Sequence, residues 1–335
     1  MNLIKRIRAK TRQKWSYGYN DIRSVLGMNE KRFHHSQGTR IVIYHGLCRD
    51  DHTRFNSIFL RVKTFEDHLK FYKKHFNIIS LEDYYLRRFN NDRFTICITF
   101  DDGFANNYKY VLPLMNEYGI PVTFFITGIR DAGYDILWND FLCLAQKYGP
   151  GKFRFLDEEF YKDGHEVYIS KTYNRSLKEL SRGDGFDKKA GIMKLFEPLL
   201  SRENKMQEED YWLQMTEEQI KDLSASPFAT IGCHGYYHND LSRIPVNDAG
   251  NEMIRSKQYL ENITQKEINS IAFPYGAYSR EVIVEAKSAG FNKLLATDFL
   301  FPEDYADPML QERFAVNPYI SVNNQMLATI NGKYQ

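Results

Sequence analysis

The sequence predicts an α/β protein, built on a mostly parallel sheet or barrel with helices on its outside. Short apolar, β-branched runs recur along the chain, and segments with helical spacing of apolar residues separate them. Polar residues directly follow several of these runs, as expected where parallel strands end at one edge. A chain of 335 residues is long enough for one such barrel with insertions.

Strands and helices are expected in alternation along two stretches of the chain. Strands are expected where apolar and β-branched residues run together, and helices where apolar residues recur every three or four positions. Gly119 and Gly290 end two of the helices, as glycine often does. The expected strands are residues 40–44, 77–80, 94–100, 121–127, 228–232, 270–273, 291–297 and 313–316, and the expected helices are 64–76, 110–120, 248–262 and 281–290.

The alternation stops between residues 129 and 215. The dipeptide Asp163-Gly164 is suited to turn a hairpin there, and residues 175–215 are charged with a helical pattern. We therefore expect an inserted α+β subdomain or lid. The expected division is a basic N-terminal segment (1–37), a barrel (38–320), an insertion or lid within it (129–215) and a C-terminal tail (321–335).

The overall composition argues against nucleic-acid binding and against a membrane-spanning chain. The formal net charge is only +2, so no nucleic-acid partner is expected. No apolar run is long enough for a transmembrane helix or a secretory signal. The four cysteines form no CxxC pair, which fits a reducing compartment. We expect a cytoplasmic protein.

The N-terminus is strongly basic, and no acidic residue precedes Asp21. Such a segment either makes weak contact with the anionic inner face of a membrane or stays solvated. Comparing cell fractions with and without residues 1–15 separates these alternatives. The cationic residues are Lys5, Arg6, Arg8, Lys10, Arg12 and Lys14.

Two adjacent aspartates end one expected strand. Asp101 and Asp102 follow the apolar run 94–100 and precede Gly103. Neighbouring side chains of a strand point to opposite faces, but a bend before the glycine would let both serve one centre. Two unpaired carboxylates beside an apolar interior are costly, and a metal ion would relieve that cost. The alternative is that both cap the next helix and lie in water.

Two further motifs follow other expected strands. His234 and His238 are four residues apart, a spacing that occurs in zinc sites but also by chance. With one aspartate they would form a ligand set for a hydrolytic divalent metal. Farther along, Pro274 and Gly276 favour a tight turn, which is either ordinary or presents a backbone N–H to a developing oxyanion.

Taken in this order, the motifs resemble the polysaccharide deacetylases of carbohydrate esterase family 4, the NodB-homology domain. This resemblance implies a distorted (β/α) barrel that removes N- or O-acetyl groups from glycans with a divalent metal, often zinc. It covers roughly residues 38–128 and 216–318. The matching stretches are ITFDDGF (98–104), IGCHGYYHNDLS (231–242) and IAFPYGAYS (271–279), and RIVIYHGL (40–47) resembles the opening strand of the exopolysaccharide-modifying branch.

The resemblance gives each motif residue a role. Asp101 matches the general base and Asp102 the metal-binding aspartate. His234 and His238 match the two metal-binding histidines, and the backbone N–H of Tyr275 matches the oxyanion contact. The expected cofactor is a divalent metal, with Zn²⁺ first among the candidates, and the expected partner is an acetylated oligo- or polysaccharide or a lipid-linked sugar.

The chain departs from the family pattern in two places. Many members have an arginine shortly before the proline of the third motif, where this chain has Ile-Ala-Phe at 271–273. Arg313 is either its substitute or part of a surface ion pair. Many members also have a late histidine as general acid, but no histidine follows His238. His45, at the end of the first expected strand, is either that acid or structural.

The expected function is metal-dependent removal of acetyl groups, N-acetyl before O-acetyl, from a glycan or glycan precursor. Each acid or base would contribute about 10²–10⁴ in rate. The alternatives are a deformylase or small-molecule amidase on the same barrel, or a glycan-binding pseudoenzyme. Measuring whether formate or acetate is released distinguishes a deformylase or other amidase from a deacetylase. A deacetylase assay with added Zn²⁺ distinguishes an enzyme from a glycan-binding pseudoenzyme.

Overall fold

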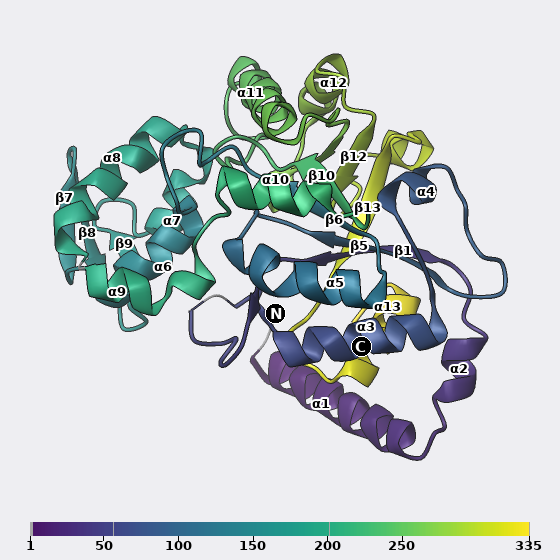
Figure 1. Ribbon diagram of the computed structural model, residues 1–335. Helices are drawn as coiled ribbons and strands as arrows, with labels where there is room; N and C mark the ends of the chain where they lie inside the picture. The colour runs from purple at the N-terminus through teal and green to yellow at the C-terminus, as the bar shows by residue number, and fades with distance from the viewer. Residues whose placement is uncertain (1–2, 56, 201, 335) are drawn as a thin grey trace.

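A closed barrel of parallel strands forms the centre of the computed structural model, which describes residues 3–55, 57–200 and 202–334 (Figure 1). Strand β1 pairs with both β13 and β5, which closes seven of the eight strands of the sheet into a ring. The strands are β1 (Thr39–Tyr44), β4 (Asn77–Ile79), β5 (Thr95–Phe100), β6 (Val122–Ile126), β10 (Ala229–Cys233), β11 (Ser270–Ala272), β12 (Lys293–Ala296) and β13 (Leu310–Ala315).

Strand β5 shows how the barrel is built. Its first half pairs with β4 and its second half with β6, while β1 runs along its other side. All six of its residues are buried, because one face packs on the outer helices and the other lines the barrel interior. Ile96, Ile98 and Phe100 belong to the outer core, whereas Cys97 belongs to a small inner core. The expected α/β barrel is confirmed.

Helices cover the outside of the barrel. In α3, Phe65, Leu69 and Tyr72 are fully buried at the spacing of one helical face. The expected helix 110–120 is a π-helical turn, Asn107–Val111, followed by α5, which ends at a left-handed Gly119. The covering helices are α3 (Val62–His75), α5 (Leu112–Tyr118), α10 (Glu217–Ala225), α11 (Val246–Thr264) and α12 (Arg280–Ser288), and short strands β2 (Leu47–Cys48) and β3 (Leu60–Arg61) precede α3. Helix α4 (Leu81–Tyr85) instead packs on the inner core through Leu81.

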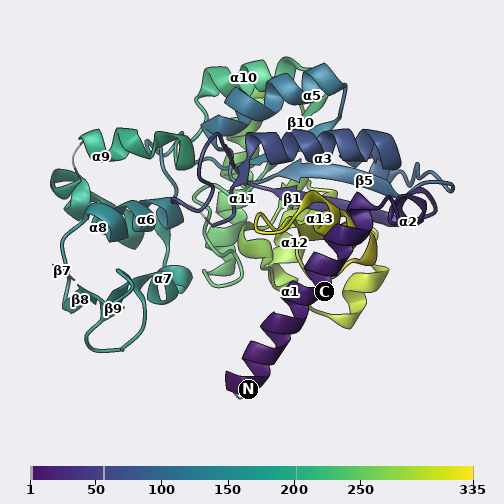
Figure 2. The same ribbon diagram turned by 90° about the horizontal axis from the view of Figure 1, so that it is seen from below.

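The insertion forms an α+β subdomain beside the barrel (Figures 1 and 2). It has its own apolar core, which includes Trp138, Phe141 and Phe196. The carboxylate of Asp163 accepts the backbone N–H of His165 and of Val167, which closes the expected hairpin turn. Its main elements are α6 (Trp138–Tyr148), β7 (Lys152–Phe155), β8 (Glu158–Lys162), β9 (Tyr168–Ser170), α7 (Leu177–Leu180), α8 (Phe186–Phe196) and α9 (Arg202–Gln207), and the three strands are antiparallel.

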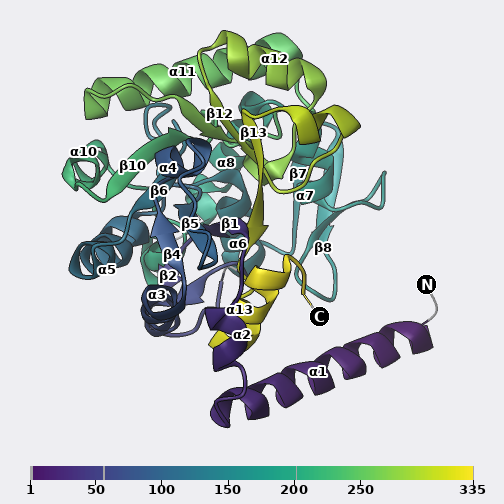
Figure 3. The same ribbon diagram turned by 90° about the vertical axis from the view of Figure 1, so that its right-hand side faces the viewer.

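Both ends of the chain are helical. The segment 321–335, which we expected to be a tail, contains α13 (Val322–Asn331), and its Met326 and Leu327 belong to the barrel's outer core. Helix α1 (Leu3–Val25) packs on α13, and its N-terminal end extends past the barrel (Figures 2 and 3). Helix α2 (Glu30–His34) follows.

The basic N-terminus lies only partly within the described part of the chain. The side chains of residues 1–11, which include Lys5, Arg6, Arg8 and Lys10, lie outside the described residues. Arg12 and Lys14 are exposed. None of the described helices has the length and apolarity that crossing a bilayer requires.

Candidate active site and metal centre

The two adjacent aspartates lie at the carboxyl end of β5 and are both buried. Cys97, Thr99 and Asp101 alternate along β5, which directs Asp101 toward the barrel interior. Asp102 would point to the opposite face of a straight strand. Its backbone instead has a φ of 75°, and Gly103 follows with a φ of 77°. This left-handed bend lets two neighbouring carboxylates approach one centre, as expected.

Arg313 binds Asp101 inside the barrel. Its two terminal nitrogens donate to the two carboxylate oxygens at 2.7 Å each, and one of them also donates to Thr99 Oγ1 at 3.2 Å. The guanidinium is buried and lies 5.3 Å from the centre of the Phe125 ring. The expected alternative of a surface ion pair is therefore wrong. Arg313 lies opposite Ile41 of β1, and its side chain reaches Asp101 through the barrel interior.

The ionisation of Asp101 is controlled by two opposing effects. Burial raises the pKa of the carboxyl group, but the charge of Arg313 and its hydrogen bonds bring that pKa below its ordinary value. Asp101 is therefore an anion with a fixed orientation. Each of its oxygens retains a lone pair that the guanidinium does not use.

The two histidines meet Asp102. His234 follows β10, and its backbone N–H donates to Ile126 O at 2.9 Å, which fixes the start of the loop. Its Nδ1 lies 2.7 Å from Ala272 O, and because a carbonyl only accepts, Nδ1 carries the proton. Nε2 of His234 lies 3.3 Å from Asp102 Oδ1, and Nε2 of His238 lies 3.2 Å from the same oxygen.

These three side chains, the Asp-His-His cluster, fit a divalent metal. Their ligand atoms all lie within 4.8 Å of one another, and all three residues are buried. One carboxylate and two imidazoles are a donor set that zinc prefers. The bond from His234 Nδ1 to a carbonyl is the second contact that metal-binding histidines usually make. Burial raises the pKa of Asp102, but its close contacts with the imidazoles of His234 and His238 lower that pKa well below its ordinary value.

Tyr275 lies beside His238 in the turn after β11. Its backbone φ is 61°, and its ring centre lies 4.9 Å from that of His238. The hydrogen bonds within the turn are donated by the N–H groups of Gly276 and Ala277. The Tyr275 N–H takes no part in those two bonds. Burial raises the pKa of the Tyr275 hydroxyl to about 12, so the phenol is protonated.

His45 lies at the end of β1, next to the aspartates. Tyr44 is paired with Phe100, and the Asp101 N–H donates to Tyr44 O, so His45 and Asp101 follow neighbouring strand ends. The side chain is half-buried. Its positive charge, when protonated, lowers the pKa of both aspartates. His45 and the two aspartates thus lie at the same end of the barrel.

Three residues of the site have left-handed backbone conformations. Asp102, His238 and Tyr275 have φ values of 75°, 58° and 61°. Each such residue costs of order 1–3 kcal/mol, and strain of this kind concentrates at functional sites. The sequence predicted a bend at Asp102 and a tight turn around Tyr275, but gave no sign of the left-handed conformation of His238.

The insertion supplies residues that sequence reasoning also missed. Asn139 of α6 donates to the Tyr275 hydroxyl at 2.9 Å. Arg182 donates to Asp240 at 2.7 Å, and its guanidinium lies 5.0 Å from the Tyr275 ring centre. Lys189 of α8 donates to Asn239 at 2.5 Å. The insertion therefore packs on both the histidine loop and the Tyr275 turn, and no spacing in the sequence marked these contacts.

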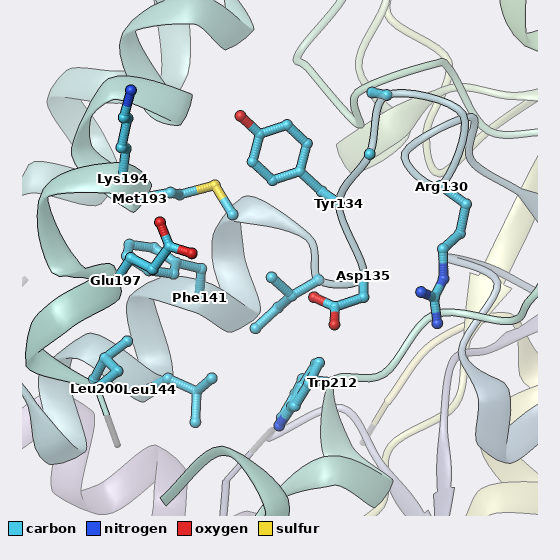
Figure 4. A pocket seen from close by; sticks show the side chains of 13 residues that line it. Arg130, Tyr134, Asp135, Phe141, Leu144, Met193, Lys194, Glu197, Leu200 and Trp212 are labelled. Atoms are coloured by element: carbon cyan, nitrogen blue, oxygen red, sulfur yellow. The ribbon is translucent and has the colours of Figure 1, made fainter. Parts of the chain in front are cut away.

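A cavity of 670 Å³ lies within the insertion (Figure 4). Aromatic and charged side chains surround it, including Tyr134, Phe141, Lys194 and Trp212. None of the residues that line it is an expected site residue. One wall of the cavity is near the barrel. Arg130, which lines the cavity, donates to Gln214 O, and Gln214 forms a β-bridge with Phe104.

Comparisons with known proteins agree with the observed fold. A family model described as polysaccharide deacetylase matches residues 89–176 and 204–294, more than half of the chain. YxkH of Bacillus subtilis, whose name places it with the polysaccharide deacetylases, is 19% identical over 262 residues. That match covers 77% of this chain, and the chain spans only 64% of the length of YxkH.

Solved structures show the same fold. The Streptococcus pyogenes deacetylase PplD, in complex with acetate, superposes with a TM-score of 0.57 at 15% identity, covering 88% of this chain and 99% of that chain. IcaB from Ammonifex degensii superposes with a TM-score of 0.54 at 16% identity, and the match covers 88% of this chain and 99% of that chain.

Proposed function

The chain belongs to the polysaccharide deacetylase family, and from this premise we propose that it removes acetyl groups, N-acetyl before O-acetyl, from a glycan or glycan precursor by metal-dependent hydrolysis. One observation carries the proposal. The Asp-His-His cluster is a buried three-ligand set, and a separate ionised carboxylate, Asp101, lies 3.9 Å from one of its imidazoles.

Asp102, His234 and His238 would hold the metal, with Zn²⁺ as the first candidate. A divalent ion in that position supplies Lewis-acid polarisation of the acetyl carbonyl and favours ionisation of water. Asp102 provides the negative charge that a dication requires. His234 presents Nε2 because Ala272 O holds the proton on Nδ1.

Asp101 would act as the general base. Its orientation is fixed by Arg313, and its free lone pairs allow it to accept a proton from the attacking water. The Tyr275 N–H would stabilise the negative charge that develops on the carbonyl oxygen. His45 would donate a proton to the leaving nitrogen, which an amine requires before it can depart.

The same site could also serve a deformylase of lipid-linked sugars or a small-molecule amidase, and these differ from a deacetylase in the acid released. The missing arginine and the missing late histidine gave a glycan-binding pseudoenzyme some weight as an alternative, but Arg313 donates to the proposed base. This geometry therefore favours turnover over glycan binding alone.

The experiment that tests the proposal is product analysis on N-acetylated oligosaccharides with added Zn²⁺. We expect acetate rather than formate, and no detectable turnover by Asp101→Asn, which should still bind the metal. His234→Ala should lose both turnover and metal. If both variants retained full hydrolytic activity, the assignment of these residues would be wrong.

We also propose a cytoplasmic location with contact to the inner face of the membrane through α1. Trp15, Tyr19 and Ile22 recur on one face of α1, and Leu26 follows the helix; the four residues are 76%, 60%, 62% and 68% exposed, in that order. The basic residues before Asp21 suit an anionic lipid surface. Such contact would bring the site near lipid-linked sugars.

Sedimentation with vesicles tests this contact. The protein should bind vesicles rich in phosphatidylglycerol and not neutral phosphatidylcholine vesicles, and binding should weaken with salt. Trp15→Ser should reduce it. Equal recovery with both vesicle types would argue against an electrostatic contact.

A further inference from the structure

A second group of potential metal ligands lies far from the barrel's active site, where the N-terminal segment meets α3. Glu30 and His34 are at the two ends of α2, four residues apart, and His75 is the last residue of α3. One ligand atom from each lies within 4.8 Å of the other two. We refer to these residues as the Glu-His-His cluster.

The imidazole of His75 is fixed in position but poorly satisfied. Only 2% of the residue is exposed, and its Nδ1 has no hydrogen-bond partner among the described residues. Its Nε2 lies 3.5 Å from Glu30 Oε2. The rings of Phe71 and Phe33 lie 4.4 Å and 5.7 Å away, between centres, and hold the imidazole in place.

His34 approaches the same point from the solvent side. Its ring centre lies 5.4 Å from that of His75, and the two rings are nearly perpendicular at 75°. Two ligands at 2.0–2.1 Å from a tetrahedral zinc lie about 3.3 Å apart. The 3.5 Å separation of His75 Nε2 and Glu30 Oε2 is close to that value, and small side-chain rotations of exposed His34 would bring its nitrogen to the same distance.

Lys74 is the competing partner of Glu30. Its Nζ lies 2.9 Å from Glu30 Oε1, so the ion pair uses one carboxylate oxygen and leaves Oε2 facing His75. An exposed ion pair of this kind contributes little to stability. This ion pair does not explain why His34 and His75 both lie beside the carboxylate of Glu30.

We propose that Glu30, His34 and His75 form a second metal site, which takes Zn²⁺ through one carboxylate oxygen and two imidazole nitrogens, with water completing the shell. The site is structural, because it joins α2 of the N-terminal segment to α3 of the barrel. It is also weaker than the Asp-His-His cluster, because Lys74 lies beside it and repels a dication.

The test compares the zinc content of full-length variants after dialysis against ZnCl₂. His34 and His35 are adjacent and both exposed, so His35→Ala is a matched control for His34→Ala. We expect the wild type and His35→Ala to bind one more zinc per chain than His34→Ala. Zinc bound at the Asp-His-His cluster is the same in the wild type and in His34→Ala, so it does not affect the difference in zinc content between them. The result is therefore independent of the proposed function.

Two further readouts sharpen the test. Zn²⁺ should raise the melting temperature of the wild type more than that of His34→Ala, because only in the wild type can the ion link α2 to α3. Lys74→Met removes the competing cation and should lower the zinc concentration for half-saturation severalfold. Equal zinc content in the wild type and His34→Ala would overturn the proposal, as would a Lys74→Met variant whose zinc binding is weaker.

Discussion

The guanidinium of Arg313 holds both carboxylate oxygens of Asp101, each at 2.7 Å, across 212 residues of sequence. The bond runs from β13 to the end of β5 through the barrel interior. It sets the direction of the carboxylate and offsets the cost of burying it. An arginine just before Pro274 would reach the base from a different strand, so this chain provides the contact by another route.

Removing Arg313 should affect the rate more than substrate binding. Without the guanidinium, burial would favour a neutral Asp101 with no fixed orientation, so we expect Arg313→Met to lower kcat by about 10²-fold or more, with KM little changed. Stability should fall by about 3–5 kcal/mol, because a buried carboxylate loses its partner. Steady-state kinetics and urea unfolding measure the two effects.

Arg313→Lys is the control for that variant. It keeps a positive charge but not the two parallel hydrogen bonds, so it should recover most of the stability and only part of kcat. Wild-type kcat in Arg313→Met would contradict a positioning role for Arg313.

His45→Gln separates an acid from a structural residue. A leaving amine needs a proton, whereas a phenolate does not, so a general acid matters mainly for amide substrates. We expect His45→Gln to lose about 10²-fold or more on an N-acetylated oligosaccharide and much less on an aryl acetate. Equal losses on the two substrates would indicate that His45 only supports the structure.

The contact between Asn139 and Tyr275 tests whether the insertion belongs to the active site. Asn139→Ala and Tyr275→Phe each remove the same hydrogen bond of 2.9 Å. Each should raise the barrier for kcat/KM by about 0.5–1.5 kcal/mol. The double variant should lose little more than either single one, because both break one interaction. Fully additive losses would mean that the two side chains act separately.

His68 makes the stability of the barrel depend on pH. This α3 residue is only 1% exposed, and its Nδ1 lies 2.9 Å from the Tyr44 hydroxyl. Burial lowers its pKa from 6.5 to about 3. The unfolded chain therefore takes up the proton first, so the contribution is complete above pH 6.5 and is lost as the pH falls toward 3, by about 1.4 kcal/mol per pH unit.

The comparison with His68→Gln isolates this effect. Glutamine can keep a hydrogen bond to Tyr44 but does not titrate. Between pH 6.5 and 4.5, the free energy of unfolding should fall less steeply in the variant than in the wild type. Parallel curves from urea unfolding would show that His68 is protonated in the folded protein.

Most of the barrel could be predicted from the sequence, because strands buried on both faces appear as continuous apolar runs. The C-terminal helix could not, since α13 buries polar residues. Asn323 accepts a hydrogen bond from Asn29 and Asn324 accepts one from Asn20, and these contacts with the N-terminal segment satisfy the two buried amides. A pattern of apolar spacing does not record such contacts.

The site divides in the same way. Asp101, Asp102, His234 and His238 were found because polar residues directly after apolar strands are conspicuous. The sequence left open whether Arg313 is the buried partner of Asp101, because Gln311 and Glu312 of the same strand are also polar and an arginine in such a strand is usually exposed. The contact of Asn139 with Tyr275 depends on how the insertion folds back on the barrel, which no local pattern records.

Acetate release before and after metal removal tests the central claim most directly. The wild-type protein should release acetate from N-acetylated oligosaccharides, stop after a chelator has removed its metal, and recover when Zn²⁺ is returned, while His234→Ala stays inactive throughout. An undiminished rate in the chelated wild type, or in His234→Ala, would contradict the claim that Asp102, His234 and His238 hold the ion on which turnover depends.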